Sequence, residues 1–100
     1  MTDTLEWRRV LVLSTAHLRW ETCKRLEEAD PDNWPCAGAP IPYGFYIYAH
    51  DEDGDGQIEA FAPELWHALK FARKRGADYV QFDCDASPID ALPDFSSTHA

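Results

Sequence analysis

The segment HDEDGDGQIEAFAPE at residues 50–64 has the residue types and spacing of a calcium-binding loop. Three aspartates fall at positions one, three and five of the twelve-residue loop, and these are Asp51, Asp53 and Asp55. Gly56 takes the turn position, but the bidentate glutamate that position twelve requires is replaced by Ala62. Strand-like residues also precede the loop, where a calcium site has a helix. We therefore predict a solvated turn without physiological metal, with weak, millimolar calcium binding left open.

A second segment, YVQFDCDAS at residues 79–87, resembles the first motif of an aspartate-nucleophile phosphatase. In that chemistry Asp83 is the nucleophile and Asp85 the acid–base. The motif lies late in the chain, because 13 residues follow Ser87 and no lysine or arginine follows Arg75. The later lysine and magnesium ligand of this chemistry are therefore not expected. Asx turns at the end of a strand explain the aspartates better.

His17 is the third candidate for chemistry, because the stretch STAHL places it in the first turn of an expected helix. A nucleophilic cysteine could pair with it, and the chain has three, namely Cys23, Cys36 and Cys84. Their odd number and the lack of a C-x-x-C pair disfavour disulfides and a zinc knuckle, so we expect free thiols. The alternative function is thus a small enzyme or ligand-binding module with a pocket near His17 or near Asp83 and Asp85.

Charge is distributed unevenly along the chain, whose formal net charge is −9 at pH 7. All nine lysines and arginines fall between residues 8 and 25 or between residues 70 and 75. Residues 26–69 contain ten acids and no lysine or arginine. Direct nucleic-acid binding is disfavoured, because phosphate contacts need clustered positive charge. A basic protein partner is favoured on the same grounds, and the alternative is that the acids only keep a small protein soluble.

The candidate partner-binding residues are the acids of the segments EEADPD and HDEDGDGQIE. They are Glu27, Glu28, Asp30, Asp32, Asp51, Glu52, Asp53, Asp55 and Glu59.

Hydrophobic periodicity predicts four strands and two helices in this chain. The strands are expected at residues 8–15, 43–49, 57–61 and 79–83, and the helices at residues 16–29 and 63–75. The second and third strands would form a hairpin around the acidic turn, and Trp34 of the proline-rich loop would pack on the core. The β-α-β-β-α-β order predicts an α+β fold, an antiparallel four-stranded sheet with two helices on one face in the ferredoxin-like plan.

Length and composition predict one domain over residues 1–100, with a frayed tail at about residues 95–100. No apolar run reaches the ~20 residues of a membrane span, and the N-terminus lacks the apolar core of a signal peptide. We expect a cytoplasmic protein without cofactor or membrane contact. It would be a monomer or a weak homodimer, paired through the aromatic stretch YGFYIY if that stretch is a sheet edge.

Three segments together, LSTAHL, YGFYIYA and FDCDASPIDALP, resemble a small uncharacterised family of bacterial mobile elements and phages. The shared pattern is a Ser-Thr-Ala-His opening and an Asp-x-Asp-Ala-x-Pro ending, over about residues 10–93. The resemblance implies no catalytic residue. It implies a genomic setting in which small acidic proteins inhibit host defence, as anti-CRISPR and anti-restriction proteins do.

The leading hypothesis is therefore a non-enzymatic acidic binding protein. Its carboxylates would take the place of phosphates on the basic nucleic-acid-binding surface of a partner such as a CRISPR effector subunit or a restriction enzyme. The setting would be the cytoplasm of the bacterial host.

Overall fold

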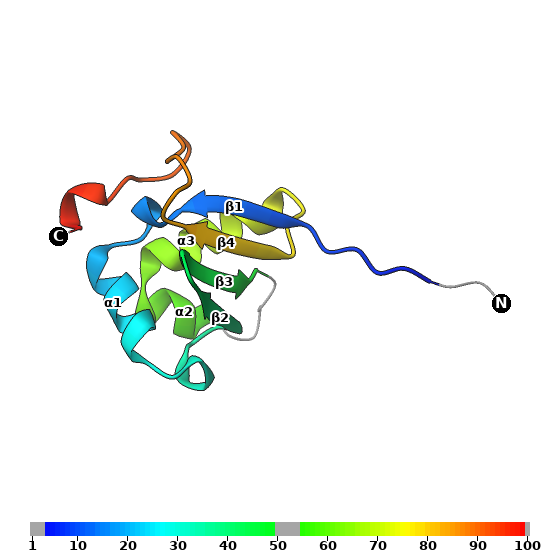
Figure 1. Cartoon of the computed structure of the whole chain (residues 1–100), viewed down its shortest axis with the longest axis horizontal. Coiled ribbons are helices and arrows are strands. Elements are labelled where there is room, and N and C mark those ends of the chain that lie inside the picture. The colour runs from blue at the N-terminus through cyan, green and yellow to red at the C-terminus, as the bar shows by residue number, and fades with distance from the viewer. Residues whose placement is uncertain (1–3, 50–54, 100) are drawn as a thin grey trace.

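The computed structural model describes residues 4–49 and 55–99, which form one sheet with helices packed against one of its faces (Figure 1). Its elements in chain order are β1 (Val10–Ser14), η1 (Thr15–His17), α1 (Trp20–Glu28), η2 (Pro31–Asn33), β2 (Gly38–Ile41), β3 (Gly44–Tyr48), α2 (Asp55–Phe61), α3 (Pro63–Lys74), β4 (Tyr79–Asp83) and η3 (Ser96–Thr98). Residues 4–9 run away from the body of the molecule as an extended segment (Figure 1).

The four strands lie in the order β1-β4-β3-β2. β4 pairs in parallel with β1 and antiparallel with β3, and β3 pairs antiparallel with β2. Antiparallel pairing therefore dominates. The parallel β1–β4 pair brings the C-terminal ends of these two strands next to each other, at one end of the sheet. The predicted α+β fold class, with a four-stranded sheet and two main helices, is confirmed.

Strand side chains alternate between a covered face and an open face of the sheet. The covered face is almost fully buried and consists of Leu13, Phe45, Ile47, Val80 and Phe82. Helix α3 packs its own buried stripe of Leu65, Ala68, Leu69 and Ala72 into the same core. On the open face Val10 and Val12 are exposed, and the ring of Tyr79 stacks on that of Tyr46 at 4.8 Å. The helices thus leave one face of the sheet uncovered.

Trp34 packs on the core, as the sequence predicts. Its indole nitrogen donates a hydrogen bond to the carbonyl of Leu26 at 3.1 Å, and its ring meets Phe45 edge-on at 6.0 Å. Both contacts fix the irregular loop between α1 and β2, because a buried indole N–H needs a partner.

The strand predicted at residues 57–61 is wrong, because these residues belong to helix α2. Ile58 lies four residues before Ala62 and seven before Leu65, and all three are buried. The spacing from Ile58 to Ala62 is that of one helical turn, while Leu65 belongs to the next helix, because the backbone is extended at Ala62 between α2 and α3. The five-residue stretch QIEAF fits strand alternation equally well when taken alone. The hairpin predicted around the acidic segment is therefore wrong as well.

The hairpin that forms joins β2 to β3 through Pro42 and Tyr43. Pro40 is tolerated within β2 because this strand lies at an edge of the sheet, where one row of backbone groups needs no partner. Gly44 opens β3 with a φ of 156°, and a side chain there would overlap the backbone oxygen of Phe82. Since β3 lies between β2 and β4, the stretch YGFYIY is not a free edge.

The first helix begins at Trp20 and not at residue 16, because a short 3₁₀ turn comes first. The hydroxyl of Ser14 caps that turn by accepting the N–H of Ala16 at 3.0 Å. The tail expected to fray is folded through residue 99. Phe95 donates its N–H to the carbonyl of Ala16 at 2.7 Å, and the Thr98 hydroxyl accepts the N–H of Trp20 at 3.1 Å.

Candidate functional site

The two segments that suggested catalysis meet at one side of the sheet. Ser14 at the end of β1 is paired in register with Asp83 at the end of β4. His17 follows shortly after β1, and Cys84 and Asp85 follow directly after β4. The sequence-predicted candidates for the enzyme alternative are therefore neighbours in the fold, and their contacts decide what chemistry they can do.

His17 is buried, with 1% of its surface exposed, and both of its ring nitrogens are bonded within the fold. Nε2 accepts the backbone N–H of Ile89 at 3.0 Å, and Nδ1 lies 2.8 Å from the carbonyl oxygen of Pro93. Because an acceptor nitrogen carries no proton, Nδ1 must carry it and donate to Pro93. Neither nitrogen is left to take a proton from a substrate, so His17 fastens the C-terminal loop to η1.

Asp83 and Asp85 form an Asx turn. One carboxylate oxygen of Asp83 accepts the N–H of Asp85 at 2.8 Å, and the other accepts the side-chain amide of Gln81 at 3.3 Å. The interpretation of these aspartates as strand-end turn residues is confirmed. Asp83, Cys84 and Asp85 hold potential metal ligands within 4.8 Å of one another, which is the usual consequence of adjacent side chains in a tight turn.

A pocket of about 300 Å³ opens beside this turn, between α1, the β2–β3 turn and the C-terminal residues. Its walls are mostly apolar and aromatic, and its polar and reactive side chains come from Thr15, Cys23, Glu27, Cys84 and His99. All three cysteines are free thiols, as predicted, with Cys23 and Cys36 buried and Cys84 exposed.

The two thiols of this pocket are poor nucleophiles at neutral pH. Burial, together with the carboxylates of Glu27 and Glu64, raises the pKa of the Cys23 thiol to about 11. Desolvation and the neighbouring carboxylates of Asp85 and Asp83 raise the pKa of the Cys84 thiol as well. His99 donates its Nε2–H to the carbonyl of Leu18 at 2.8 Å and not to a thiol. Among the residues described, no imidazole is hydrogen-bonded to either thiol.

The predicted partner-binding acids divide into those the structure describes and those it does not. Glu27 and Glu28 are exposed at the end of α1, Asp30 and Asp32 are exposed around η2, and Glu59 is exposed on α2. These five acids are called the acidic face below. Asp51, Glu52 and Asp53 lie outside the described residues, and Asp55 begins α2 with its side chain outside them.

Helix α2 contains the second half of the segment that resembles a calcium-binding loop. Loop positions five, six, eight and nine, which are Asp55, Gly56, Ile58 and Glu59, are helical. A calcium loop needs a sharp turn at position six so that successive ligands converge, and helical backbone points successive side chains in different directions. The described half of the segment therefore has helical shape, and the predicted hairpin setting is wrong.

The cationic side chains are engaged mainly with aromatic rings and leave the acidic face largely uncompensated. Among the described residues, cations lie over rings in six pairs: Arg19–Phe95, Lys24–Trp20, Arg25–Phe61, Lys70–Trp66, Arg73–Trp66 and Arg75–Phe71. Arg25 also donates to the carbonyl of Phe61 at 2.9 Å, which ties α1 to the end of α2. Lys24 and Glu27 form an exposed ion pair at 3.6 Å, a contact worth at most about 1 kcal/mol.

Glu64 is an acid with a structural role, and the sequence patterns did not single it out. It is 9% exposed, and its Oε2 accepts the backbone N–H of Arg19 at 3.0 Å and the hydroxyl of Thr22 at 2.5 Å. It therefore caps the N-terminus of α1, where the helix dipole favours negative charge. Its partners lie more than 40 residues away in sequence, so no local motif could reveal them.

Residues 10–97 match the model of a family described as the C-terminal domain of DUF5983, a family of unknown function. The chain belongs to this family. The match contains both the His17 turn and the Asp83–Asp85 turn, and it begins at the first residue of β1, so the extended segment of residues 4–9 lies outside it. No curated protein and no solved structure matches the chain. None of the helices in the described part of the chain combines the length and apolar character needed to cross a bilayer.

Proposed function

We propose that this chain is a non-enzymatic binding protein that presents its acidic face to a basic surface of another protein. The observation that carries the proposal is the exposure of these acids, next to cations that are held mainly over aromatic rings. The five acids of the acidic face are exposed, and most of the described cations lie over aromatic rings. Glu27 forms a weak exposed ion pair with Lys24 and Asp30 caps η2, while an exposed carboxylate without an ion pair keeps its full attraction for an incoming lysine or arginine.

The proposed mechanism is competitive occupation of a phosphate-binding surface. Carboxylates at the end of α1, around η2 and on α2 would pair with the lysines and arginines that otherwise hold nucleic-acid phosphates. The partner would be a nucleic-acid-handling protein such as a CRISPR effector subunit or a restriction enzyme, met in the cytoplasm of a bacterial host. The acidic face and the absence of lysine and arginine from residues 26–69 support this finer proposal.

A catalytic role near His17 or Asp83 is less well supported by the contacts. The ring nitrogens of His17 and the carboxylate of Asp83 are all hydrogen-bonded inside the fold. The thiolate of buried Cys23 is disfavoured by burial and by neighbouring carboxylates, and that of exposed Cys84 by desolvation and by Asp85 and Asp83. Exposed acids such as Glu28 and Glu59 are therefore better candidates for contact with another molecule.

The test begins with affinity capture of a partner from a bacterial lysate and continues with binding kinetics on the identified partner. The acidic-face variant combines Glu27→Gln, Glu28→Gln, Asp32→Asn and Glu59→Gln. Asp30 is kept, because its carboxylate accepts the N–H of Asp32 at 3.0 Å and caps η2. The matched control removes the same number of charges at other exposed acids, with Glu6→Gln, Glu21→Gln, Asp85→Asn and Asp90→Asn.

Steering by charge predicts that the acidic-face variant associates roughly tenfold more slowly than wild type at low salt. The control variant should associate at close to the wild-type rate. Equal association rates for wild type and the acidic-face variant would reject the proposal. So would a captured partner whose binding is lost in His17→Ala, with the fold intact, and kept in the acidic-face variant.

A further inference from the structure

The two edges of the sheet differ in how well they are protected. β2 forms one edge with the sequence GAPI, in which Pro40 removes a backbone donor, and Pro42 follows directly. β1 forms the other edge with the sequence VLVLS, which contains no proline, glycine or charge. Charged residues, prolines and bulges are what keep edge strands from pairing with another chain. The β1 edge has none of these devices within the strand.

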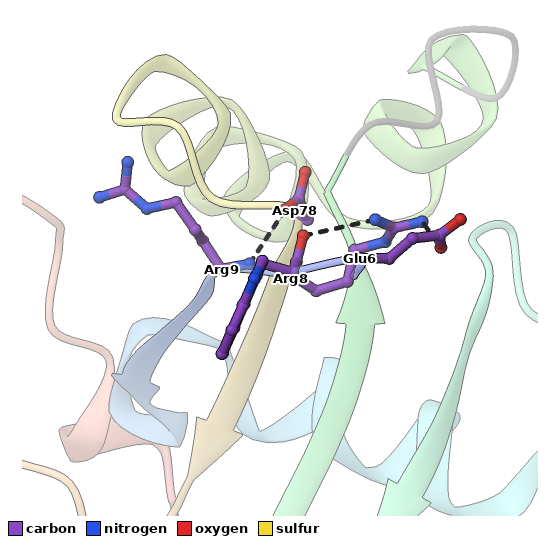
Figure 2. A network of polar contacts seen from close by, with 5 residues as sticks. Glu6, Arg8, Arg9 and Asp78 are labelled. Carbon is purple, nitrogen blue, oxygen red and sulfur yellow. Dashed lines mark hydrogen bonds and ion pairs between the residues drawn. The ribbon is translucent and has the colours of Figure 1, made fainter. Parts of the chain in front are cut away.

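The backbone of β1 offers hydrogen-bonding groups on its free side. Arg9, just before the strand, donates its N–H to the carboxylate of Asp78 at 2.9 Å (Figure 2). Its carbonyl accepts the N–H groups of Asp78 at 2.8 Å and Tyr79 at 3.1 Å. Arg9 therefore faces β4. Since alternate residues of a strand point their N–H and C=O groups to opposite sides, Val10 and Val12 present theirs at the free edge.

Exposed apolar side chains follow the same edge. Five of the six large hydrophobic residues that are exposed in the described part of the chain are Leu5 at 71%, Trp7 at 81%, Val10 at 41%, Val12 at 49% and Ile89 at 37%. Leu5 and Trp7 come just before β1, in the segment that leaves the body of the molecule (Figure 1). Ile89 lies past the other end of β1, because its N–H is held by His17 in the turn that follows the strand.

Charge along this edge is opposite at its two ends. Arg8 and Arg9 lie at the N-terminal end of β1, where Arg8 pairs with Glu6 at 3.4 Å (Figure 2). At the C-terminal end, Asp83 is paired in register with Ser14, and Asp85 follows it. A second copy laid antiparallel along β1 brings its arginines toward these aspartates. Glu6 and Asp78 partly offset the arginines at their end, but antiparallel pairing still brings unlike charges nearer than parallel pairing does, and it is the orientation that a two-fold axis gives.

We propose that two copies of this chain pair through the free edges of β1, antiparallel and related by a two-fold axis, to form one sheet continuous across both copies. Leu5 and Trp7 of each copy then lie along the outer edge of the other copy, toward its Ile89. The part of the acidic face around η2 lies beside the opposite edge, since η2 contacts β2, so the pairing leaves Asp30 and Asp32 accessible. The two-fold pairing uses both free β1 edges and closes, which limits the assembly to a dimer.

The decisive variant is Val12→Pro, tested by sedimentation equilibrium over a range of concentrations. Proline removes the N–H that faces the free edge and spares the hydrogen bonds that the neighbouring residues make with β4. We expect wild type to reach twice the 11.4 kDa chain mass and Val12→Pro to stay monomeric. Val12→Thr is the matched control, because it keeps the N–H and the preference for strands, and it should dimerise like wild type.

Val12→Lys provides a second test that leaves the backbone unchanged. It places a charge on the strand close to its counterpart in the other copy, which should weaken the dimer by tenfold or more. Trp7→Ala should weaken it to a smaller extent, and circular dichroism checks that each variant is folded. The proposal is overturned if wild type is monomeric at about millimolar concentration. It is also overturned if Val12→Pro and Val12→Lys, both folded, dimerise like wild type, or if wild type forms open-ended multimers.

Discussion

The turn region at the ends of β1 and β4 and the acidic face use polar side chains in opposite ways. In the turn region, His17 and Asp83 have the residue types of a catalytic centre, yet their hydrogen-bonding atoms are bonded to nearby groups of the same chain. In the acidic face, Glu28 and Glu59 have no distinctive motif, yet they are exposed on helices that hold them in place. The comparison teaches that residue type alone does not mark a site, because a side chain acts on another molecule only with atoms that the fold has left free.

The largest expected effect is that of His17→Ala on stability. The change leaves the part-buried N–H of Ile89 and the carbonyl of Pro93 without their partner, and it opens a cavity where the buried imidazole lay. Each unsatisfied buried group costs about 1–3 kcal/mol, so the free energy of unfolding should fall by roughly 3–4 kcal/mol. Urea denaturation measures this fall.

His67→Ala is the control for that change, because His67 is exposed and its loss should alter stability by less than about 0.5 kcal/mol. A His17→Ala protein as stable as wild type would show that the C-terminal loop is held by other contacts. It would then weaken the contrast between a structural turn region and a binding acidic face.

Replacement of Glu64 should give the next largest loss of stability. Its buried carboxylate accepts the backbone N–H of Arg19 at the start of α1. Glu64→Ala should lower the free energy of unfolding by about 2 kcal/mol, since the N–H of Arg19 and the hydroxyl of Thr22 lose their acceptor. Glu64→Gln keeps one acceptor oxygen and should cost less. Thermal denaturation of both variants checks the order, and an equal loss in both would mean that charge, not the hydrogen bond, stabilises α1.

A smaller effect is expected from the pH dependence of Cys23. Its thiol has a pKa of about 11 in the folded chain, raised from 9.0 by burial first and by Glu27 and Glu64 second. Between these values the unfolded chain has lost the proton that the folded chain retains. The contribution to stability is therefore complete below pH 9 and declines as pH rises toward 11.

Cys23→Ala isolates this contribution, because other groups titrate in the same range. As pH rises from 9 to 11, the free energy of unfolding of wild type should fall relative to that of Cys23→Ala. A difference that is constant over this range would contradict the assignment. Alkylation at neutral pH offers an independent check, in which exposed Cys84 should react before buried Cys23 and Cys36.

Particular residues show how far the sequence could predict this molecule. The strands around Leu13 and Phe82 and the helix around Leu69 were predictable, because their hydrophobic periods are long enough to be unambiguous. The prediction of a strand at residues 57–61 was wrong because Ile58 fits both the helical and the strand period. The sequence did not predict β2, because Pro40 argues against a strand except at a sheet edge.

Of the candidate functional site, the sequence could predict only the exposed acidic residues. The exposure of Glu27, Glu28, Asp30, Asp32 and Glu59 follows from composition, because charged residues are seldom buried without partners. The roles of His17 and Glu64 were not predictable. Their partners lie 72, 76, 42 and 45 residues away along the chain, and only the folded topology brings them together.

The salt dependence of association, measured for wild type, the acidic-face variant and the matched control variant, tests the central claim most directly. Exposed charges are screened over about 8 Å near physiological ionic strength. Wild type and the control variant should therefore lose association rate steeply as salt rises. The acidic-face variant should begin slower and lose little, so that the rates converge at high salt. Three parallel salt dependences, with the acidic-face variant as fast as wild type at low salt, would contradict the claim that the acidic face directs binding.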